Sequence, residues 1–318
     1  MSVILGLNLS DRIYLLADSR VSYEDKATKK TVVKHDNMMK IEPLEELDAC
    51  VIASAGDAKF AQFIINGINR DFSSADINKL RAEVEDWAKE QAHQYFQKYN
   101  SHANFIIAGI DDSRKNKILA NGFFQVVDDY GEGKPFTGRM KTLLANALKN
   151  RDASEDTIQL NSNANVLFSL RINYATGVEL EDAEWGEVLI SGPAGVSKED
   201  IGNKDIGRFE FEFTPGDDIQ EDSLLLIAIL DRLIQRKNLE NVGGAHVPMC
   251  LFSNKLLATL NKRIYSSNPD GSDPQFVSAY TIKNNQFYRL DENEAEHLME
   301  KVSLAKFDDK TDETMYTV

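Results

Sequence analysis

The chain has 318 residues and an acidic composition, with 51 Asp and Glu residues against 36 Lys and Arg residues and a formal net charge of −15. This length suffices for about two average domains, or for one large domain with a substantial core. Affinity for nucleic acids and for anionic membranes comes mainly from Lys and Arg, so the charge argues against both partners. An enzyme that acts on peptides or small molecules is compatible with this composition.

The sequence also indicates a compartment. No apolar run approaches the roughly 18 residues of a membrane-spanning helix, and the start of the chain lacks the basic segment of a signal peptide. Cys50 and Cys250 each lie inside an apolar run, which favours two buried thiols over a disulfide framework. We therefore expect a cytoplasmic protein. The five histidines share no metal-ligand spacing and phosphate-binding glycine motifs are absent, so we expect no metal and no cofactor.

In the first third of the chain, short apolar runs predict strands and two amphipathic stretches predict helices. The expected strands lie at residues 3–9, 13–17, 38–41 and 49–53, with a polar loop or exposed hairpin at 23–37. Asp57 is placed to begin the first helix, and one apolar stripe predicts a second helix over 76–99. Two more strands are expected at 104–110 and 117–127.

Residues 128–186 are the least regular part of the sequence, with a short helix predicted near 139–149 and a strand near 165–174. The helix predicted over 217–237 is apolar over most of its surface and should be central to the core. The remaining expectations are strands at 187–191, 246–253 and 276–290, and a charged tail at 306–318 that frays. Strand hairpins beside each helical block favour an α+β fold with antiparallel sheets and helices on their faces.

The start of the chain carries the strongest chemical signal. A small second residue normally permits removal of the initiator methionine, which would leave Ser2 with a free α-amine. Such a serine is a self-contained catalytic unit, because the amine has an ordinary pKa of about 7.7–8.0 and accepts the hydroxyl proton as a general base. The chemistry also needs a nearby cation, which lowers the pKa of the hydroxyl, and a backbone N–H that faces the developing oxyanion.

Later segments supply groups of these kinds. Antiparallel pairing of the first two strands brings Ser2 to the same end of the sheet as Ala17-Asp18-Ser19-Arg20. Lys40 offers a cation in the next predicted strand, and Ser54-Ala55-Gly56-Asp57 forms a junction between a strand and a helix. The sequence therefore predicts a catalytic site at this end of the sheet.

These motifs resemble those of proteasome β-subunits, which are N-terminal nucleophile hydrolases, and of their bacterial ancestral β-subunit relatives. The resemblance covers the first 110 residues most closely. In that family the Asp of an A-D-S-R motif stands 16 residues after the nucleophile, as Asp18 does after Ser2. A lysine that opens a strand is matched by Lys40, and an Ala-Gly turn before the first helix by Gly56. Weaker matches follow at 108–111, at Ser191-Gly192 and at 241–244.

The resemblance implies a four-layer αββα sandwich of two antiparallel sheets flanked by helices. It also implies a set of catalytic residues, which are Ser2, Asp18, Lys40, Arg20, Gly56 and Ser191. Ser2 would be the nucleophile and its amine the base. Asp18 would form an ion pair with Lys40 that holds the lysine beside Ser2.

The other implied roles stand beside ordinary structural alternatives. Arg20 would support the loop, although with Asp18 it could form a simple turn pair. Gly56 would offer its amide to the oxyanion, although it could merely supply a permissive turn. Ser191 would assist near the amine, although serine is more often a turn former. Lys40 could itself be an ordinary strand-edge lysine.

The chain departs from the family pattern in three places. The nucleophile is serine, whereas threonine is usual in proteasomes. Lys40 follows Asp18 by 22 residues instead of 16, which implies an insertion within 23–37, and Lys34 has the family spacing without the strand context. The acidic and serine pair that precedes the late glycine turn in the family is not clearly reproduced at 239–242.

We therefore predict one domain over 1–318, with a family-specific insertion at about 128–186 and a C-terminal extension at about 260–318. The predicted function is hydrolysis of peptide or amide bonds after removal of Met1, within a homo-oligomer such as a ring. The sequence does not indicate whether an ATPase partner exists. The alternatives are a catalytically inactive scaffold or binding module, which retention of Met1 would favour, and a hydrolase of small amides.

Overall fold

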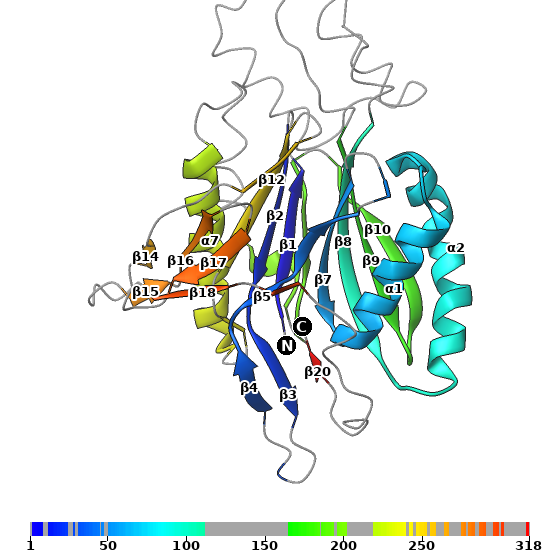
Figure 1. Ribbon diagram of the computed structural model, residues 1–318, viewed down its shortest axis with the longest axis horizontal. Coiled ribbons are helices and arrows are strands. Elements are labelled where there is room, and N and C mark those ends of the chain that lie inside the picture. Colours follow the sequence, from blue (N-terminus) through cyan, green and yellow to red (C-terminus); the bar gives the residue numbers. More distant parts are fainter. Residues whose placement is uncertain are drawn as a thin grey trace, which may run out of the picture.

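The computed structural model has two antiparallel sheets at its centre and helices on both outer faces (Figure 1). The structure describes residues 2–8, 12–24, 28, 31–44, 46–47, 50–111, 165–184, 186–193, 196–201, 219–239, 242–243, 246–252, 255–258, 264–266, 275–277, 279–283, 286–290, 295–298, 300–301 and 316–317. The strand predicted at 117–127 and the helix predicted near 139–149 lie outside these residues.

The first sheet is built around the N-terminal hairpin. Its strand order is β11-β1-β2-β12-β13, and all neighbours are antiparallel. The strands are β1 (Ile4–Asn8), β2 (Arg12–Asp18), β11 (Val188–Ser191), β12 (His246–Phe252) and β13 (Lys255–Ala258). Every residue of β1 and β2 is buried, as the nearly uninterrupted apolar pattern of this hairpin predicts.

The second sheet has the strand order β10-β9-β8-β7-β6, again with antiparallel neighbours. Its strands are β6 (Ile41–Pro43), β7 (Cys50–Gly56), β8 (His102–Ile110), β9 (Asn165–Asn173) and β10 (Gly177–Asp182). Residues 165–182 lie within the segment expected as an insertion at about 128–186, and the strand predicted near 165–174 is β9. These residues continue the sheet beyond β8, and β9 buries Phe168 and Leu170 in the core.

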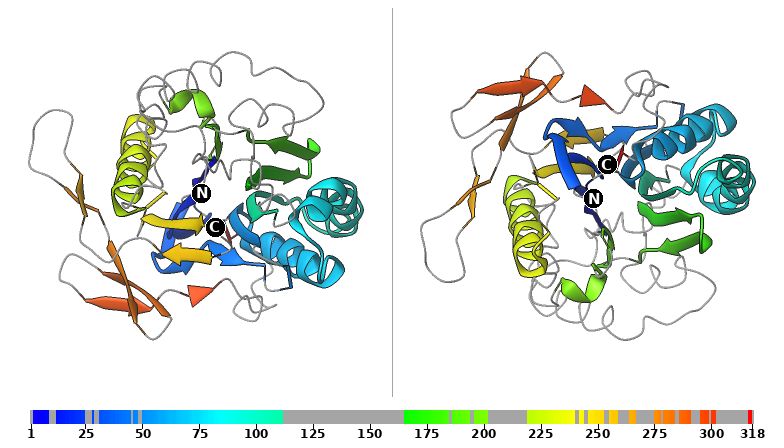
Figure 2. Two further views of the ribbon diagram at one scale, coloured as in Figure 1. Left: turned by 90° about the horizontal axis from the view of Figure 1, so that it is seen from above. Right: turned by 90° about the horizontal axis from the view of Figure 1, so that it is seen from below.

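Helices cover both outer faces and complete the predicted four layers. α1 (Ala58–Asp71) and α2 (Ile77–Phe96) pack on the second sheet, and α7 (Ile219–Lys237) packs on the first (Figures 1 and 2). Asp57 caps α1 by accepting hydrogen bonds from two backbone N–H groups, as expected, and Asp76 caps α2. A short 3-10 helix, η3, covers Lys198–Asp200.

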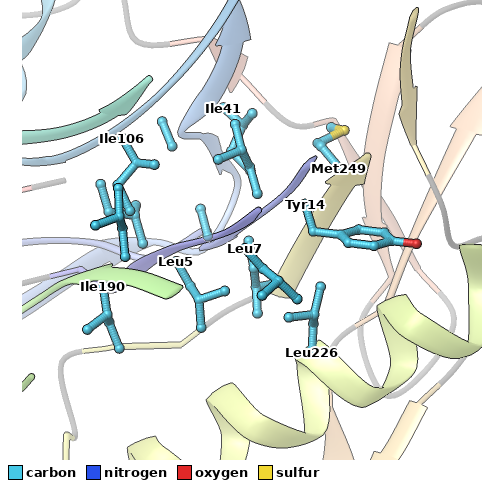
Figure 3. Packing of buried hydrophobic residues seen from close by; sticks show 14 of the residues in the cluster. Leu5, Leu7, Tyr14, Ile41, Ile106, Ile190, Leu226 and Met249 are labelled. Carbon is cyan, nitrogen blue, oxygen red and sulfur yellow. The ribbon is translucent and has the colours of Figure 1, made fainter. Parts of the chain in front are cut away.

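The largest apolar cluster fills the space between the sheets and continues under α7. Leu5 and Leu7 of β1 point toward Leu226 of α7, while Ile106 of β8 lies on the other side of β1 (Figure 3). The sheets approach closely at Gly6, where an added Cβ would lie 2.8 Å from a methyl carbon of Ile106. This packing fixes β1 between the second sheet and α7, and so fixes the position of the residues that precede it.

The segment predicted as a loop or exposed hairpin at 23–37 is a hairpin of β3 (Val21–Glu24) and β4 (Thr31–His35). β20 (Tyr316–Thr317) pairs with the other edge of β3. The prediction that the whole tail frays is therefore wrong for these two residues, because a free strand edge supplies hydrogen-bonding partners that composition does not reveal.

Shorter strands make up the rest of the described C-terminal part. β5 (Met38–Met39) pairs in parallel with β19 (Glu300–Lys301). The other strands are β14 (Ile264–Ser266), β15 (Gln275–Val277), β16 (Ala279–Lys283), β17 (Gln286–Leu290) and β18 (Glu296–Leu298). Cys50 and Cys250 are buried thiols, as predicted. Within the described part of the chain, no helix is long and apolar enough to cross a membrane.

Candidate active site

Asp18 is the centre of a buried polar network at one end of the first sheet. It ends β2, and its side chain is fully buried. Oδ1 accepts a hydrogen bond from the Val3 backbone N–H at 3.0 Å. Oδ2 accepts from Lys40 Nζ at 3.0 Å, and from the backbone N–H groups of Arg20 and Gly243 at 3.2 and 3.3 Å. These four donors stabilise an ionised carboxylate that has no access to water.

Lys40 lies between β5 and β6, and its side chain is also fully buried. Nζ donates to Ser2 Oγ at 2.6 Å, to the Arg20 carbonyl oxygen at 2.7 Å and to Asp18 Oδ2 at 3.0 Å. A lysine ammonium has three N–H donors, and each has an acceptor here. Burial lowers the pKa of Lys40 below its usual value, while the Asp18 carboxylate acts in the opposite direction. The lysine is thus held against the hydroxyl oxygen of Ser2.

Ser2 stands two residues before the start of β1 and is only 3% exposed. Two residues later, Ile4 pairs with Ala17 of β2 on one side and with Ser191 of β11 on the other. The hairpin register therefore brings Asp18 opposite Val3, next to Ser2, which is the juxtaposition that antiparallel pairing predicts.

The backbone of Arg20 is part of this network, whereas its side chain points away from the network toward Asp36. Its carbonyl oxygen accepts from Lys40, and its guanidinium donates to Asp36 through Nε at 2.8 Å and Nη2 at 3.1 Å. The Ser19 hydroxyl donates to the Asp36 carbonyl oxygen at 2.5 Å. Asp36 also raises the pKa of Arg20. The base of the β3–β4 hairpin is therefore tied to the carbonyl group that orients the lysine.

Gly243 closes the network from the segment before β12. Its N–H donates to Asp18, and its carbonyl oxygen accepts from the Ser19 N–H at 3.1 Å. An added Cβ would lie 2.9 Å from Cζ of Arg20. A side chain at this position would therefore require the guanidinium of Arg20 to shift.

Gly56 ends β7 at the junction with α1. Its φ angle is +110°, and an added Cβ would lie 2.6 Å from the His102 carbonyl oxygen. Both facts explain why glycine stands here. Ser54, two residues earlier, donates its N–H to the Lys40 carbonyl oxygen at 2.9 Å. The end of β7 therefore lies beside the segment that carries the lysine.

Ser191 ends β11, the edge strand next to β1, and is buried. It lines a cavity of about 390 Å³ whose walls come from both sheets. Charged walls include Arg171 and Lys198, and both contact Glu181 at 3.5 and 3.1 Å. Ser191 thus lies between the first strand and an open polar space.

The structure brings three of the six predicted site residues into direct contact, and these are Ser2, Asp18 and Lys40. Arg20 joins them through its backbone. Within the described part of the chain, the hydrogen bonds of these four residues do not include Gly56 or Ser191, which lie at the ends of neighbouring strands. Lys34, which the family spacing offers as an alternative, belongs to β4, whereas Lys40 contacts Ser2.

Sequence reasoning missed Asp36 and the contacts of Gly243. Asp36 falls in a segment that was expected only to be polar, and its partner Arg20 is distant in sequence. The Gly-Gly pair at 243–244 did signal a special turn, but nothing in the sequence indicated that its amide binds Asp18. A buried carboxylate with unassigned hydrogen-bond acceptors is the signal that would have prompted a search for such amides.

No protein-family model matches the chain, and no curated protein matches it. Among solved structures, the chain is similar to an Anbu (Gly-1) mutant from Hyphomicrobium sp. strain MC1, at 14% identity and a TM-score of 0.43 over 85% of this chain and 90% of that chain. It is also similar to Anbu (ancestral beta-subunit) from Yersinia bercovieri, at 14% identity and a TM-score of 0.41 over 82% of this chain and 88% of that chain. The four-layer arrangement of this chain is established by the strand order and packing described above. Both similar structures are Anbu proteins, which belong to the family that the sequence motifs resemble.

Proposed function

We propose that this protein is an N-terminal serine hydrolase that cleaves peptide or amide bonds after removal of Met1. The observation that carries the proposal is the 2.6 Å hydrogen bond from Lys40 Nζ to Ser2 Oγ, within a buried ion pair of Lys40 and Asp18. A cation at this distance stabilises the alkoxide form of the serine and so lowers the pKa of its hydroxyl. Desolvation of the whole cluster strengthens that effect.

In the proposed reaction, the free amine of Ser2 accepts the hydroxyl proton as Oγ attacks the substrate carbonyl carbon. The carbonyl oxygen takes up the negative charge, and the Gly56 N–H is the proposed donor to it. Collapse of the tetrahedral intermediate breaks the C–N bond, and the amine group returns the proton to the leaving nitrogen. Water then attacks the resulting ester by the same route and releases the acid, which regenerates Ser2.

The remaining residues position these groups. Asp18 and the Arg20 carbonyl group orient Lys40, because each accepts one of its three hydrogen bonds. The burial-lowered pKa of Lys40 also makes it a second group able to hold the serine proton. Ser191 is proposed to assist near the amine from the adjacent strand. We further propose that the protein is cytoplasmic and homo-oligomeric and needs no cofactor.

The second candidate function is an inactive scaffold that keeps the same fold. The four donors on Asp18 favour it, because they link the end of β2 to the residue before β1, to Lys40 and to the segment before β12 whether or not chemistry occurs. In this case Met1 is retained, and the Ser2 nitrogen is an amide without basic character.

Intact mass spectrometry and an electrophilic peptide probe separate the two functions. The hydrolase proposal predicts loss of Met1 and a probe adduct that Ser2→Ala abolishes and Ser73→Ala, at an exposed serine, leaves unchanged. Full retention of Met1 would overturn the proposal, and so would equal labelling of the Ser2→Ala protein.

A further inference from the structure

The outer edge of β3 is occupied by the chain's own C-terminal segment. β3 pairs with β4 on one side and with β20 on the other. The β20 pairing is antiparallel, with Tyr316 opposite Tyr23 and Thr317 opposite Ser22. These two residues are far from β3 in the sequence, so their pairing depends on the fold and not on a local turn.

This edge lies directly beside the candidate active site. β3 begins immediately after Arg20, whose carbonyl oxygen accepts the hydrogen bond from Lys40. β20 also lies against β7, the strand that ends at Gly56, and against α1. Figures 1 and 2 show the two ends of the chain next to each other at this end of the sheets. The C-terminal segment therefore contacts β3, which directly follows Arg20, and β7, which ends at Gly56.

A strand edge binds any extended backbone, because its N–H and C=O groups recognise the peptide unit and not a particular side chain. An extended polypeptide substrate of the proposed hydrolase would need such an edge to align its scissile bond with Ser2. In this structure the edge beside Ser2 is already paired, and the pairing comprises only two residues. A strand pairing of only two residues is short enough for an incoming peptide to displace it.

We propose that residues 316–317 form an internal competitor, which occupies the peptide-binding edge of β3 and must be displaced before an extended polypeptide reaches Ser2. The predicted inhibition rests on the proposed hydrolase function, whereas the occupancy of the β3 edge by residues 316–317 does not. The proposal assigns the substrate class as extended polypeptide, and it predicts that the protein is partly self-inhibited.

Hydrogen exchange tests the occupancy without any reaction. The double variant Tyr316→Pro/Thr317→Pro removes both backbone N–H groups of β20, whereas Tyr316→Ala/Thr317→Ala keeps them. We expect the β3 amides that face β20 to exchange about tenfold faster in the proline variant, with the alanine variant close to the natural protein. The β3 amides that face β4 and the β1 amides should be unchanged in both variants. Equal exchange at 21–24 in the natural protein and the proline variant would overturn the inference.

The rate of Ser2 labelling by an electrophilic peptide probe tests the competition. If the edge is occupied about nine-tenths of the time, its release makes labelling by a subsaturating probe about tenfold faster in the proline variant. A small electrophile that binds no strand edge serves as control and should label all variants equally. Faster exchange with unchanged peptide labelling would overturn the competition. Absence of labelling in every protein would instead refute the proposed hydrolase, while the exchange result still decides the occupancy.

Discussion

Two kinds of ion pair in this molecule differ in surroundings and in consequence. Lys40 and Asp18 are both fully buried and share their network with Ser2 and backbone amides. The pair of Arg81 and Asp182 joins α2 to β10 with side chains 31% and 56% exposed. Water and salt screen the exposed pair, so it adds little to stability, whereas removal of one partner from the buried pair leaves an uncompensated charge. A buried pair aimed at a hydroxyl group is thus the feature that indicates chemistry.

The largest expected effect comes from breaking the buried pair. Asp18→Ala leaves the Lys40 ammonium buried without a carboxylate, and we expect a loss of about 3–5 kcal/mol in the free energy of unfolding. Asp182→Ala, at the exposed pair, should cost less than about 1 kcal/mol. Urea unfolding of both variants measures the difference, and similar losses would contradict the contrast drawn here.

A smaller effect is expected at the glycine that ends β7. Gly56→Ala places a side chain at a φ of +110° and 2.6 Å from the His102 carbonyl oxygen, and we expect a loss of about 2–3 kcal/mol. Gly177→Ala is the matched control, because its φ is +90° but an added Cβ has no atom within 4 Å. Thermal unfolding should show a clearly smaller loss for Gly177→Ala, and equal losses would mean that the close contact contributes nothing.

Asp36→Asn tests whether the residues around Lys40 influence its charge. The substitution weakens the contact with Arg20, and we expect a loss of about 1 kcal/mol in stability. Asp36 raises the pKa of Lys40 and Arg20 lowers it, so the variant should lower that pKa further. If the cationic lysine promotes labelling, the alkaline limb of the pH profile for Ser2 labelling moves to lower pH. An unmoved profile would show that Asp36 acts only on the hairpin.

The smallest effect is expected at the exposed Arg70–Asp71 pair. The hydrogen bond from Arg70 lowers the pKa of Asp71 to about 2, with a further contribution from Trp87. Since the folded-state pKa lies below the unfolded value, the pair stabilises the fold above about pH 4, and this contribution is lost as the pH falls through about 2. Solvent screening keeps this contribution small. The urea midpoints of the natural protein and Asp71→Asn should converge below pH 2, and a constant difference would contradict this.

The regular part of the fold follows closely from the sequence. The nearly continuous apolar runs of β1 and β2 specify a hairpin buried on both faces, and Asp57 and Asp76 mark the starts of α1 and α2. Local signals of this kind are strong because periodicity and capping act over a few residues. The position of Asp18 opposite Val3, next to Ser2, follows from the same hairpin register.

Contacts between residues that are distant in the sequence could not be predicted from such local signals. β10, with the sequence GVELED, was not predicted as a strand, although its partner β9 was predicted near 165–174. The contacts of Asp36 and of Gly243 depend on how distant segments meet at Asp18 and Arg20. The pairing of β20 with β3 likewise needs a free edge that only the folded chain presents.

The central claim is that Lys40 is a catalytic residue and not merely half of a structural ion pair. The rate of Ser2 labelling by an electrophilic peptide probe should fall by about 10²-fold or more in Lys40→Met, because the serine loses its cation. Lys89→Met, at the exposed lysine that pairs with Glu85 and Asp86, should label at the natural rate. Equal labelling of a folded Lys40→Met protein, Lys89→Met and the natural protein would contradict the claim.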